Sequence, residues 1–421
     1  MLWKILRKMG VPDSLISVIK KLYRDVRIEC DVNGITFTFI SHSGVKQGDN
    51  LAPVLFLLAI QAALEYMDKT WPKEAQKPLF EYSRKMDEDG TSLPSGRLSA
   101  RVNTKRDLVS FEFNRSLFAD DAAFIFLSRK GIEVGTAHIN HAFRTFGLEV
   151  HLGTYHDADK KKERTTSKTE FMFIPANGEA SPAEKADITV DGNRFVSYTD
   201  MFVYLGSRIT HTLSDSTDLS ARIGKGWGAF FKAKPVLLNK HISMDLRINL
   251  FKSLVLGQVL WGCESWALTG GDRDALDTFL HQALRSMFNL RMRYVKTHRI
   301  TNTDLRARAN IPTLNSTKQV RTLHQLRKDS LKEIDSLSRR ILSCQAVRLP
   351  GHKLKRGGGP ITTQGTMRAD LEAAGLCPKG SGGDLAIWIP NLLGNPCQQI
   401  DEQLHLPEGT YRKGIKPTRK K

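Results

Sequence analysis

The chain has 421 residues, of which 40% are hydrophobic and 8% aromatic, so it can fill two or three folded domains and is not a mainly disordered polymer. Lysine and arginine number 63 against 44 aspartates and glutamates, and the resulting formal charge of +19 makes nucleic acid the first partner to consider. Five scattered cysteines without a CxxC pair indicate neither a disulfide scaffold nor a zinc ribbon.

Targeting and membrane signals are weak in this sequence. The N-terminal residues lack the apolar core of a signal peptide. The longest apolar run, 51–64, is interrupted by Pro53 and Gln61 and is shorter than the roughly 20 residues of a bilayer span. We therefore expect an intracellular protein without a membrane partner. The basic tail Lys413–Lys421 favours the nucleus over the cytoplasm without deciding between them.

The first part of the chain changes from a helical to a strand period. Apolar spacing predicts two short amphipathic helices over residues 1–25. The period then becomes two on both sides of Asn33-Gly34, which predicts a β-hairpin with a type I′ turn. A loop leads into a core helix that begins near Leu51. Residues 69–109 are polar and broken by glycine and proline, which indicates an insertion.

Asp120 and Asp121 lie between two short apolar runs, which predicts a strand-turn-strand with two carboxylates at its tip. Carboxylate oxygens are the ligands that Mg²⁺ prefers, and phosphoryl transfer often uses two such ions. An isolated pair of aspartates in a turn is more often only a turn. The aspartate pair therefore indicates a metal site only together with other segments of the chain.

The remaining helices and strands are predicted from the spacing of apolar residues alone. A helix is expected from about Gly135 to Phe146, and the apolar patches 171–174 and 202–205 are predicted to be strands of one sheet. From residue 213 to about 300 the pattern is helical. Residues 301–421 are basic and partly disordered in this interpretation. The spacing of Cys344, His352, Cys377 and Cys397 is too irregular to favour zinc ligands, and we expect buried or free thiols.

The sequence GVKQGDNLAPVLF, which begins at Gly44, also has a local interpretation. Its small residues permit close approach of a sugar or base, although alone it is only a tight loop into a helix. Followed by FADD between apolar runs, it resembles the palm of reverse transcriptases, and most closely that of the non-LTR (LINE-type) retrotransposon family. Further segments resemble this family in order: LWKILRKMGVPDSLISVIKKLY, SKTEFM, VYLGS and WGCESW.

The resemblance implies an α+β fold: a right-hand palm, with helices on one face of an antiparallel sheet, followed by a helical thumb. Residues 1–212 would be a partial palm and 213–300 the thumb, with the fingers missing. The parent activity is RNA-directed DNA polymerisation, with an RNA template, a DNA primer and deoxynucleotides as partners and Mg²⁺ or Mn²⁺ as cofactor.

The resemblance also implies roles for single residues. Asp120 would bind the metal ions with Asp121 beside it, and Phe118 would stand at an aromatic position of the family. Gln47 and Gly48 would line the nucleotide and template pocket. Lys168 would lie near the triphosphate as a charge stabiliser or proton donor, against the alternative of a solvated lysine at a strand edge.

Three residues of the VYLGS segment, Tyr204, Leu205 and Gly206, would hold the primer end, against the alternative that Tyr204 and Leu205 are ordinary sheet core. Trp261 and Trp266 are expected to be thumb core rather than base-stacking platforms.

Two departures from the family pattern affect the expected activity. Asp49-Asn50 follows Gln-Gly where the family usually has Cys-Pro, and we interpret the pair as a helix cap. The family's first catalytic aspartate belongs just before the segment that matches Leu2-Trp3, and no substitute for it is visible. Because catalytic groups act as a unit, we expect that this chain by itself does not polymerise DNA.

Two other functions remain open at this stage. A remnant with a charge of +19 could bind nucleic acid through its phosphates without any chemistry. A structural helical protein with an incidental Asp-Asp turn is disfavoured by the ordered run of palm-like segments.

Overall fold

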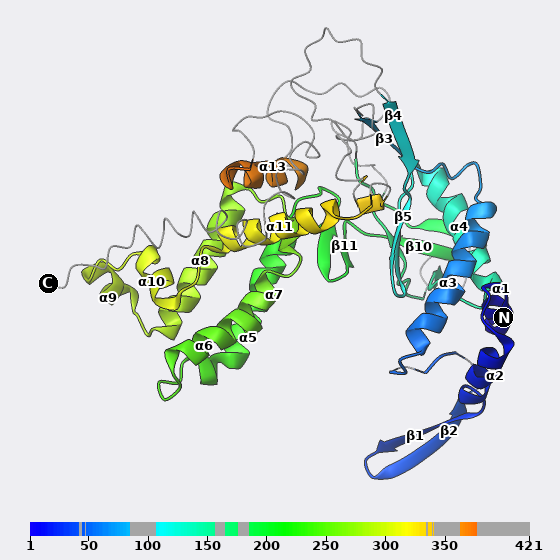
Figure 1. Ribbon diagram of the computed structural model, residues 1–421, viewed down its shortest axis with the longest axis horizontal. Helices are drawn as coiled ribbons and strands as arrows, with labels where there is room; N and C mark the ends of the chain where they lie inside the picture. The colour runs from blue at the N-terminus through cyan, green and yellow to red at the C-terminus, as the bar shows by residue number, and fades with distance from the viewer. Residues whose placement is uncertain are drawn as a thin grey trace, which may run out of the picture. The chain divides into compact units, whose positions relative to one another are not determined.

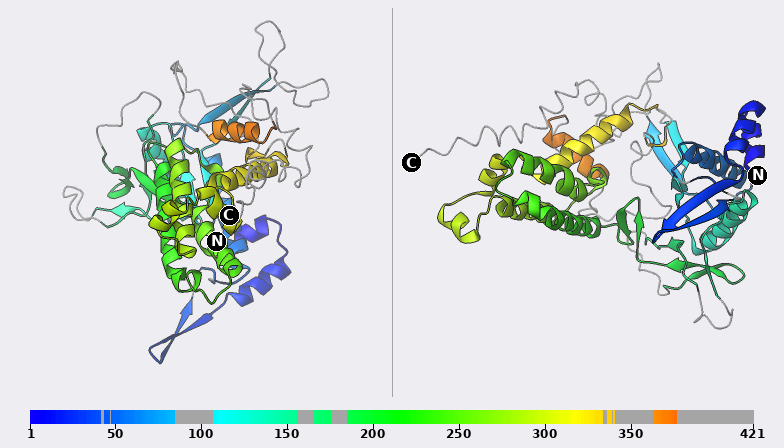
Figure 2. Two further views of the ribbon diagram at one scale, coloured as in Figure 1. Left: turned by 90° about the vertical axis from the view of Figure 1, so that its left-hand side faces the viewer. Right: turned by 90° about the horizontal axis from the view of Figure 1, so that it is seen from below.

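The computed structural model describes residues 1–41, 44–46, 48–84, 107–155, 165–175, 185–333, 336–338, 340 and 363–376 (Figures 1 and 2). The chain divides into two compact units. Unit 1 comprises Met1–Leu79, Glu112–Phe173 and Ser181–Asp200, and unit 2 comprises Phe80–Phe111, Ile174–Ala180 and Met201–Lys421. Helices and small sheets are both present, so the expected α+β class is confirmed.

Unit 1 begins with the two short helices predicted from the apolar spacing. α1 (Leu2–Lys8) and α2 (Asp13–Leu22) are too short to be stable alone, and they bury apolar side chains against α3 (Ala52–Lys69). Leu6, Ile16 and Leu55 lie in the centre of this small core. The core fixes the start of α3, which follows the glycine-containing loop.

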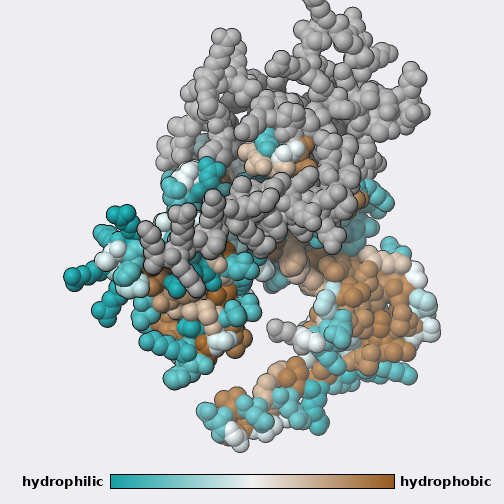
Figure 3. Space-filling view, turned by 60° about the vertical axis from the view of Figure 1, so that its left-hand side comes forward, coloured by the Kyte–Doolittle hydropathy of each residue, from teal (hydrophilic) through white to brown (hydrophobic). Residues whose placement is uncertain are grey.

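The predicted hairpin is also present. β1 (Val26–Val32) and β2 (Ile35–Ser41) pair antiparallel, and Asn33 and Gly34 have φ angles of 52° and 81°, as a type I′ turn requires. Within the described residues no third strand joins them. Figure 3 shows apolar and polar side chains exposed together along this projecting hairpin. Its register places the following apolar residues on one face: Ile28, Cys30, Val32, Ile35, Phe37 and Phe39.

The strand-turn-strand with the two aspartates packs on a pair of helices. β5 (Arg115–Phe118) and β6 (Asp121–Phe124) form an antiparallel hairpin, and α3 packs against α4 (Arg129–Thr145). Leu117 and Phe124 contact the apolar core between these two helices. The buried members of that core are Ile60, Leu64, Met67, Ile139 and Ala142.

The start of α4 was predicted too late. The helix begins at Arg129 because the Ser128 side chain caps it by accepting a hydrogen bond from the Gly131 amide at 3.0 Å. Gly135 is an interior residue, and a Cβ there would lie 2.3 Å from Cε1 of Phe126. The glycine marks a close packing contact and not a helix boundary.

The prediction that 171–174 and 202–205 share one sheet is wrong. In unit 1, β7 (Gly153–Thr154), β8 (Glu170–Phe171) and β9 (Ile188–Asp191) each pair with β10 (Arg194–Tyr198). In unit 2, β11 (Met201–Tyr204) pairs with β12 (Ser207–Thr210), and these two strands form a separate sheet among the described residues. A two-residue turn at Leu205-Gly206, with φ angles of 49° and 81°, supplies β11 with a local partner.

Two further strands, β3 (Leu79–Arg84) and β4 (Asp107–Glu112), pair with each other. They flank residues 85–106, which lie outside the described part of the chain. The insertion predicted at 69–109 is therefore described only at its two ends.

Helices dominate unit 2. The core of the unit continues past residue 300, because Leu305 and Leu314 are fully buried in it. The helical elements are α5 (Ser216–Leu237), α6 (Met244–Leu250), the π-helical η1 (Phe251–Leu256), α7 (Gly257–Val259), the 3₁₀ turn η2 (Cys263–Ser265), α8 (Gly270–Met287), α9 (Met292–Thr297), α10 (Asn302–Ala309), α11 (Leu314–Ser330) and α13 (Thr363–Ala373).

The two tryptophans predicted to be thumb core behave differently. Trp266 is buried, and its indole Nε1–H donates to the Asp218 carboxylate at 3.1 Å. Trp261 is 59% exposed, and its Nε1–H donates to the Leu205 carbonyl at 3.4 Å. The prediction is therefore wrong for Trp261, because the chain turns at Gly262, with φ of 73°, and leaves the preceding ring at the surface.

None of the helices in the described ranges combines the length and hydrophobicity needed to cross a bilayer. Cys30 and Cys263 are free thiols, and Cys263 is buried, which raises its pKa to about 11. Cys344, His352, Cys377, Cys397 and the basic tail lie outside the described residues.

Candidate active site

The Asp120–Asp121 turn is a tight, exposed tip. Ala119 and Asp120 form the two-residue loop between β5 and β6, Ala119 has a φ of 53°, and Phe118 pairs with Asp121. Because side chains alternate along a strand, Arg115, Leu117 and Phe124 share the face that packs on the helices. Phe118 and Asp121 lie on the other face, and Phe118 is 64% exposed. Both carboxylates therefore face solvent beside an open aromatic ring.

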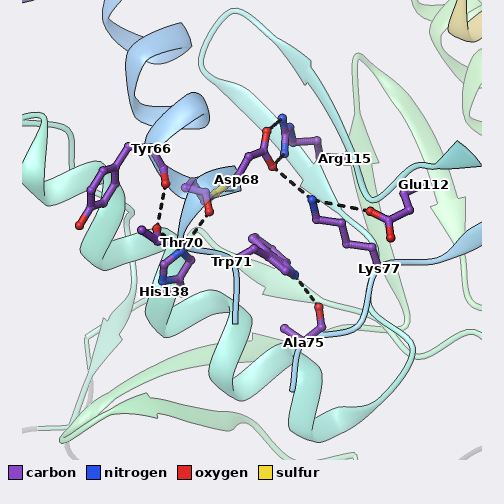
Figure 4. A network of polar contacts seen from close by, with 10 residues as sticks. Tyr66, Asp68, Thr70, Trp71, Ala75, Lys77, Glu112, Arg115 and His138 are labelled. Carbon is purple, nitrogen blue, oxygen red and sulfur yellow. Dashed lines mark hydrogen bonds and ion pairs between the residues drawn. The ribbon is translucent and has the colours of Figure 1, made fainter. Parts of the chain in front are cut away.

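An ion pair fixes the base of this hairpin to the last turn of α3 (Figure 4). Arg115 donates from Nη1 to Asp68 Oδ1 at 2.6 Å and from Nη2 to Oδ2 at 2.5 Å, a bidentate geometry that restrains both side chains. Lys77 adds a longer contact of 3.4 Å to the same carboxylate and an ion pair of 3.9 Å to Glu112. The hydrogen bond from Arg115 holds the pKa of Asp68 below its usual range.

A second set of contacts in Figure 4 closes the turn after α3. The Trp71 indole Nε1–H donates to the Ala75 carbonyl at 2.5 Å, and the Lys77 ammonium lies 5.6 Å from the centre of the Trp71 ring. His138 of α4 contacts the Thr70 hydroxyl at 3.2 Å. The hairpin thus stands on two helices and a loop that are joined by polar contacts as well as by the apolar core.

The two carboxylates by themselves do not complete a metal centre. The described residues contain no group of three His, Cys, Asp or Glu side chains placed to hold a metal ion. Mg²⁺ usually demands near-octahedral oxygen coordination, and the two-ion arrangement of nucleotidyl transfer needs ligands shared between ions about 3.5 to 4 Å apart. Asp120 and Asp121 could contribute to such a centre but do not form it within the described part of the chain.

The glycine-containing loop before α3 is partly described. Gly48 has a φ of 88°, a left-handed conformation that favours glycine, whereas Gln47 lies outside the described residues. Asp49 accepts hydrogen bonds from the Leu51 amide at 3.1 Å and from the Tyr23 hydroxyl at 2.5 Å. Leu51 is the N-cap residue of α3 and its side chain makes no capping hydrogen bond, so the predicted Asp49-Asn50 cap is wrong. The Asp49 carboxylate binds the amide of the N-cap residue and not an amide of the first helical turn. Burial and the Asp49 carboxylate together raise the pKa of Tyr23 to about 12.

Lys168 is exposed and lies just before β8. Its backbone N–H donates to His151 Nδ1 at 3.2 Å, which ties this segment to the residues preceding β7. His151 also lines a cavity of about 610 Å³ in unit 1. The charged groups of that cavity cancel, because Arg144 pairs with Glu149 and Arg194 with Asp191. Within the described part of the chain no hydrogen bond or ion pair joins Lys168 to the aspartate turn.

The proposed primer-end residues form the tip of the β11–β12 hairpin in unit 2. Leu205 is exposed, which contradicts its alternative interpretation as sheet core. The carbonyl groups of the turn are held by side chains: Gly206 accepts from Arg222 Nη2 at 2.5 Å, and Leu205 accepts from the Trp261 indole. Asp218 lies 3.7 Å from the Arg222 Nε and accepts the Arg208 amide at 2.8 Å.

Sequence reasoning missed the residues that hold both hairpins. Arg115, Asp68 and Arg222 gave no local signal, because each acts on a partner far along the chain or on a backbone carbonyl. The only hint is position: Arg115 is a charged residue on the inner face of a mostly apolar strand, where an unpaired charge would be costly.

Comparison with known proteins does not assign the chain. No protein-family model matches it, and none of the curated proteins is significantly similar to it in sequence.

Proposed function

We propose that this chain is the palm and thumb fragment of a retrotransposon-type RNA-directed DNA polymerase, which binds an RNA template with a DNA primer but does not extend the primer by itself. The observation that carries the proposal is the exposed Phe118–Asp121 turn on a hairpin whose base is fixed by the bidentate Arg115–Asp68 pair. A carboxylate that acts on a bound phosphate must be accessible and held in a fixed position.

The arrangement of α3 also supports the proposal. The loop that contains Gly48 leads into its first turn, while Asp68 in its last turn holds the Asp120 hairpin. One helix thus connects the two segments that would contact the nucleotide and the metal ions. Their order along the chain agrees with the order of these segments in the family.

The expected lack of primer extension follows from the small number of carboxylates that could bind the metal ions. Phosphoryl transfer depends on metal ions that neutralise the triphosphate and align the attacking hydroxyl, and the described residues offer two carboxylates for this work. When a member of a catalytic unit is lost, the activity commonly falls by about 10³-fold or more. Mg²⁺ or Mn²⁺ would bind to Asp120 and Asp121 weakly.

Primer extension tests the proposal directly. The full chain is incubated with an annealed RNA template and DNA primer, deoxynucleotides and Mg²⁺ or Mn²⁺, in parallel with Asp120→Ala. We expect binding of the template-primer and no incorporation above the Asp120→Ala background. Incorporation that disappears in Asp120→Ala overturns the predicted inactivity. Failure to bind the template-primer at low salt overturns the polymerase proposal as a whole.

The second candidate is a nucleic-acid-binding remnant that has no metal chemistry. The exposure of both aspartates without a hydrogen bond or ion pair to their side chains from any described residue favours it. Mn²⁺ separates the two functions. In the polymerase fragment, Mn²⁺ strengthens nucleotide binding to the wild-type chain but not to Asp120→Asn/Asp121→Asn. In the remnant, both proteins respond to Mn²⁺ equally.

A further inference from the structure

A short basic segment around α9 is exposed and has no acidic counterpart. The residues from 291 to 301 include no aspartate or glutamate, and none of their basic side chains forms an ion pair with a described residue. α9 lies at the end of unit 2 opposite the β11–β12 hairpin (Figures 1 and 2). The exposed basic residues, called the α9 patch below, are Arg291, Arg293, Lys296 and Arg299.

The fold holds these charges together. Ile300 packs against the core of unit 2, and the Thr297 hydroxyl donates to the Arg293 carbonyl at 3.0 Å. Like charges at helical spacing destabilise a helix by a few tenths of a kcal/mol per pair, here with no acidic residue to offset them. A surface that concentrates cations in this way is complementary to a polyanion.

An aromatic ring is built into the same segment. Tyr294 is 49% exposed, and His298 stacks on one face of it with the ring centres 3.8 Å apart. His298 is held in place because its Nδ1 lies 2.9 Å from the Tyr294 carbonyl. Among the described residues no other ring and no cation covers Tyr294. A half-exposed aromatic ring, stacked on His298, thus lies within the basic segment.

We propose that the α9 patch and Tyr294 bind single-stranded nucleic acid, with phosphates on the basic side chains and one unpaired base stacked on Tyr294. A duplex would satisfy the charges but would keep its bases paired and away from the ring. The proposal rests on the nucleic-acid partner of the proposed function but on none of its catalysis.

The expected effect of the charges follows from counterion release. Each phosphate contact on a single strand adds about 0.7 to the slope of log K against log salt. Arg291→Gln/Arg293→Gln/Lys296→Gln removes three such contacts, so the slope falls by about 2. A slope lower by 2 over the decade from 1 M to 0.1 M salt makes the affinity of the variant at 0.1 M about 100-fold lower than that of the wild type. Loss of the stacked base weakens binding by roughly 5- to 150-fold and leaves the slope unchanged.

The experiment is fluorescence anisotropy with the full chain and a labelled oligoadenylate of about 16 nucleotides, as RNA and as DNA, titrated over a range of salt. Inorganic polyphosphate is the polyanion without bases. The variants are the triple glutamine variant, Tyr294→Leu and Tyr294→Phe. A matched control, Lys20→Gln/Lys21→Gln/Arg24→Gln, removes three exposed charges from the α2 region of unit 1.

The proposal predicts a distinct result for each variant. The triple glutamine variant weakens binding of both the oligonucleotides and polyphosphate, Tyr294→Leu weakens binding of the oligonucleotides alone, and Tyr294→Phe binds like the wild type. Equal losses of slope in the α9 variant and the α2 control, or wild-type affinity in Tyr294→Leu, overturn the proposal. No metal or deoxynucleotide is present, so failure of primer extension has no bearing on the result.

Discussion

The contact between Arg115 and Asp68 should control how firmly the aspartate hairpin is held. We consider Asp68→Asn, which keeps the shape of the side chain, Arg115→Met, which keeps most of its length, and the double variant. Asp68→Asn leaves Arg115 without the carboxylate it binds and leaves Lys77 with the longer ion pair to Glu112 at 3.9 Å. Arg115→Met leaves the carboxylate with Lys77 as a partner. Asp68→Asn should therefore be the more damaging single change.

The size of the effect follows from geometry and exposure. A hydrogen bond to a charged group contributes about 1.5 to 3 kcal/mol when it is well shielded from water. The Arg115 and Asp68 side chains are 23% and 37% exposed, so solvent screens part of the interaction. We expect a coupling free energy of about 1 to 2 kcal/mol, which corresponds to a factor of roughly 5 to 30 in the equilibrium constant for opening of the hairpin.

Amide hydrogen exchange measured by mass spectrometry on peptides that cover β5 and β6 reads this opening directly. The four proteins form a double-mutant cycle, and the exchange of α8 in unit 2 is the internal control. A coupling below about 0.5 kcal/mol would mean that the two sites act independently. In that case the bidentate pair would not anchor the hairpin, and the apolar contacts of Leu117 and Phe124 would hold it alone.

The same pair predicts a pH dependence. Because Arg115 lowers the pKa of Asp68 in the folded chain, the unfolded chain takes up the proton first as the pH falls. The stabilisation is therefore complete above the usual carboxylate range, near pH 4, and is lost as the pH falls through the lowered folded value. In urea unfolding, the stabilities of the wild type and Asp68→Asn should converge in acid.

Three further changes test the packing and the buried polar groups, each by urea unfolding. Gly135→Ala should destabilise unit 1 by about 1 to 3 kcal/mol because its Cβ would overlap the Phe126 ring. Gly224→Ala, with open space around its Cβ, should stabilise α5 by up to about 1 kcal/mol. Equal effects of the two substitutions would contradict the close contact between Gly135 and Phe126. Asp218→Ala should cost about 3 to 5 kcal/mol because it leaves the buried Arg222 without a counter-charge, and a cost below about 1 kcal/mol would show that water or a rearrangement replaces the carboxylate. Burial and a neighbouring guanidinium lower the pKa of His281 to about 4. The unfolded chain therefore binds a proton that the folded chain does not, and the free energy of unfolding should fall as the pH drops from about 6.5 towards 4. His281→Gln should flatten this part of the plot of stability against pH, and an unchanged plot would contradict the lowered pKa.

Most errors of the sequence analysis concern contacts and exposure that apolar periodicity does not record. The strand at 202–205 was predicted correctly, but its sheet was not, because pairing with β12 through a local turn competes with every other strand. Gly135 looked like a boundary because its close contact with Phe126 leaves no trace in a periodicity. Trp261 looked like core because large aromatic rings usually are.

The local elements could be predicted from the amino-acid sequence: the first two helices, the Asn33-Gly34 hairpin and the turn that carries Asp120 and Asp121. These depend on apolar period and turn chemistry, which act between residues a few positions apart. The attachment of the aspartate turn to α3 could not be predicted in this way, because Arg115 and Asp68 meet through the packing of a strand on a helix. Side chains that pair across the fold must match in shape and charge in three dimensions. Apolar periodicity and turn residues do not indicate which of these pairs form.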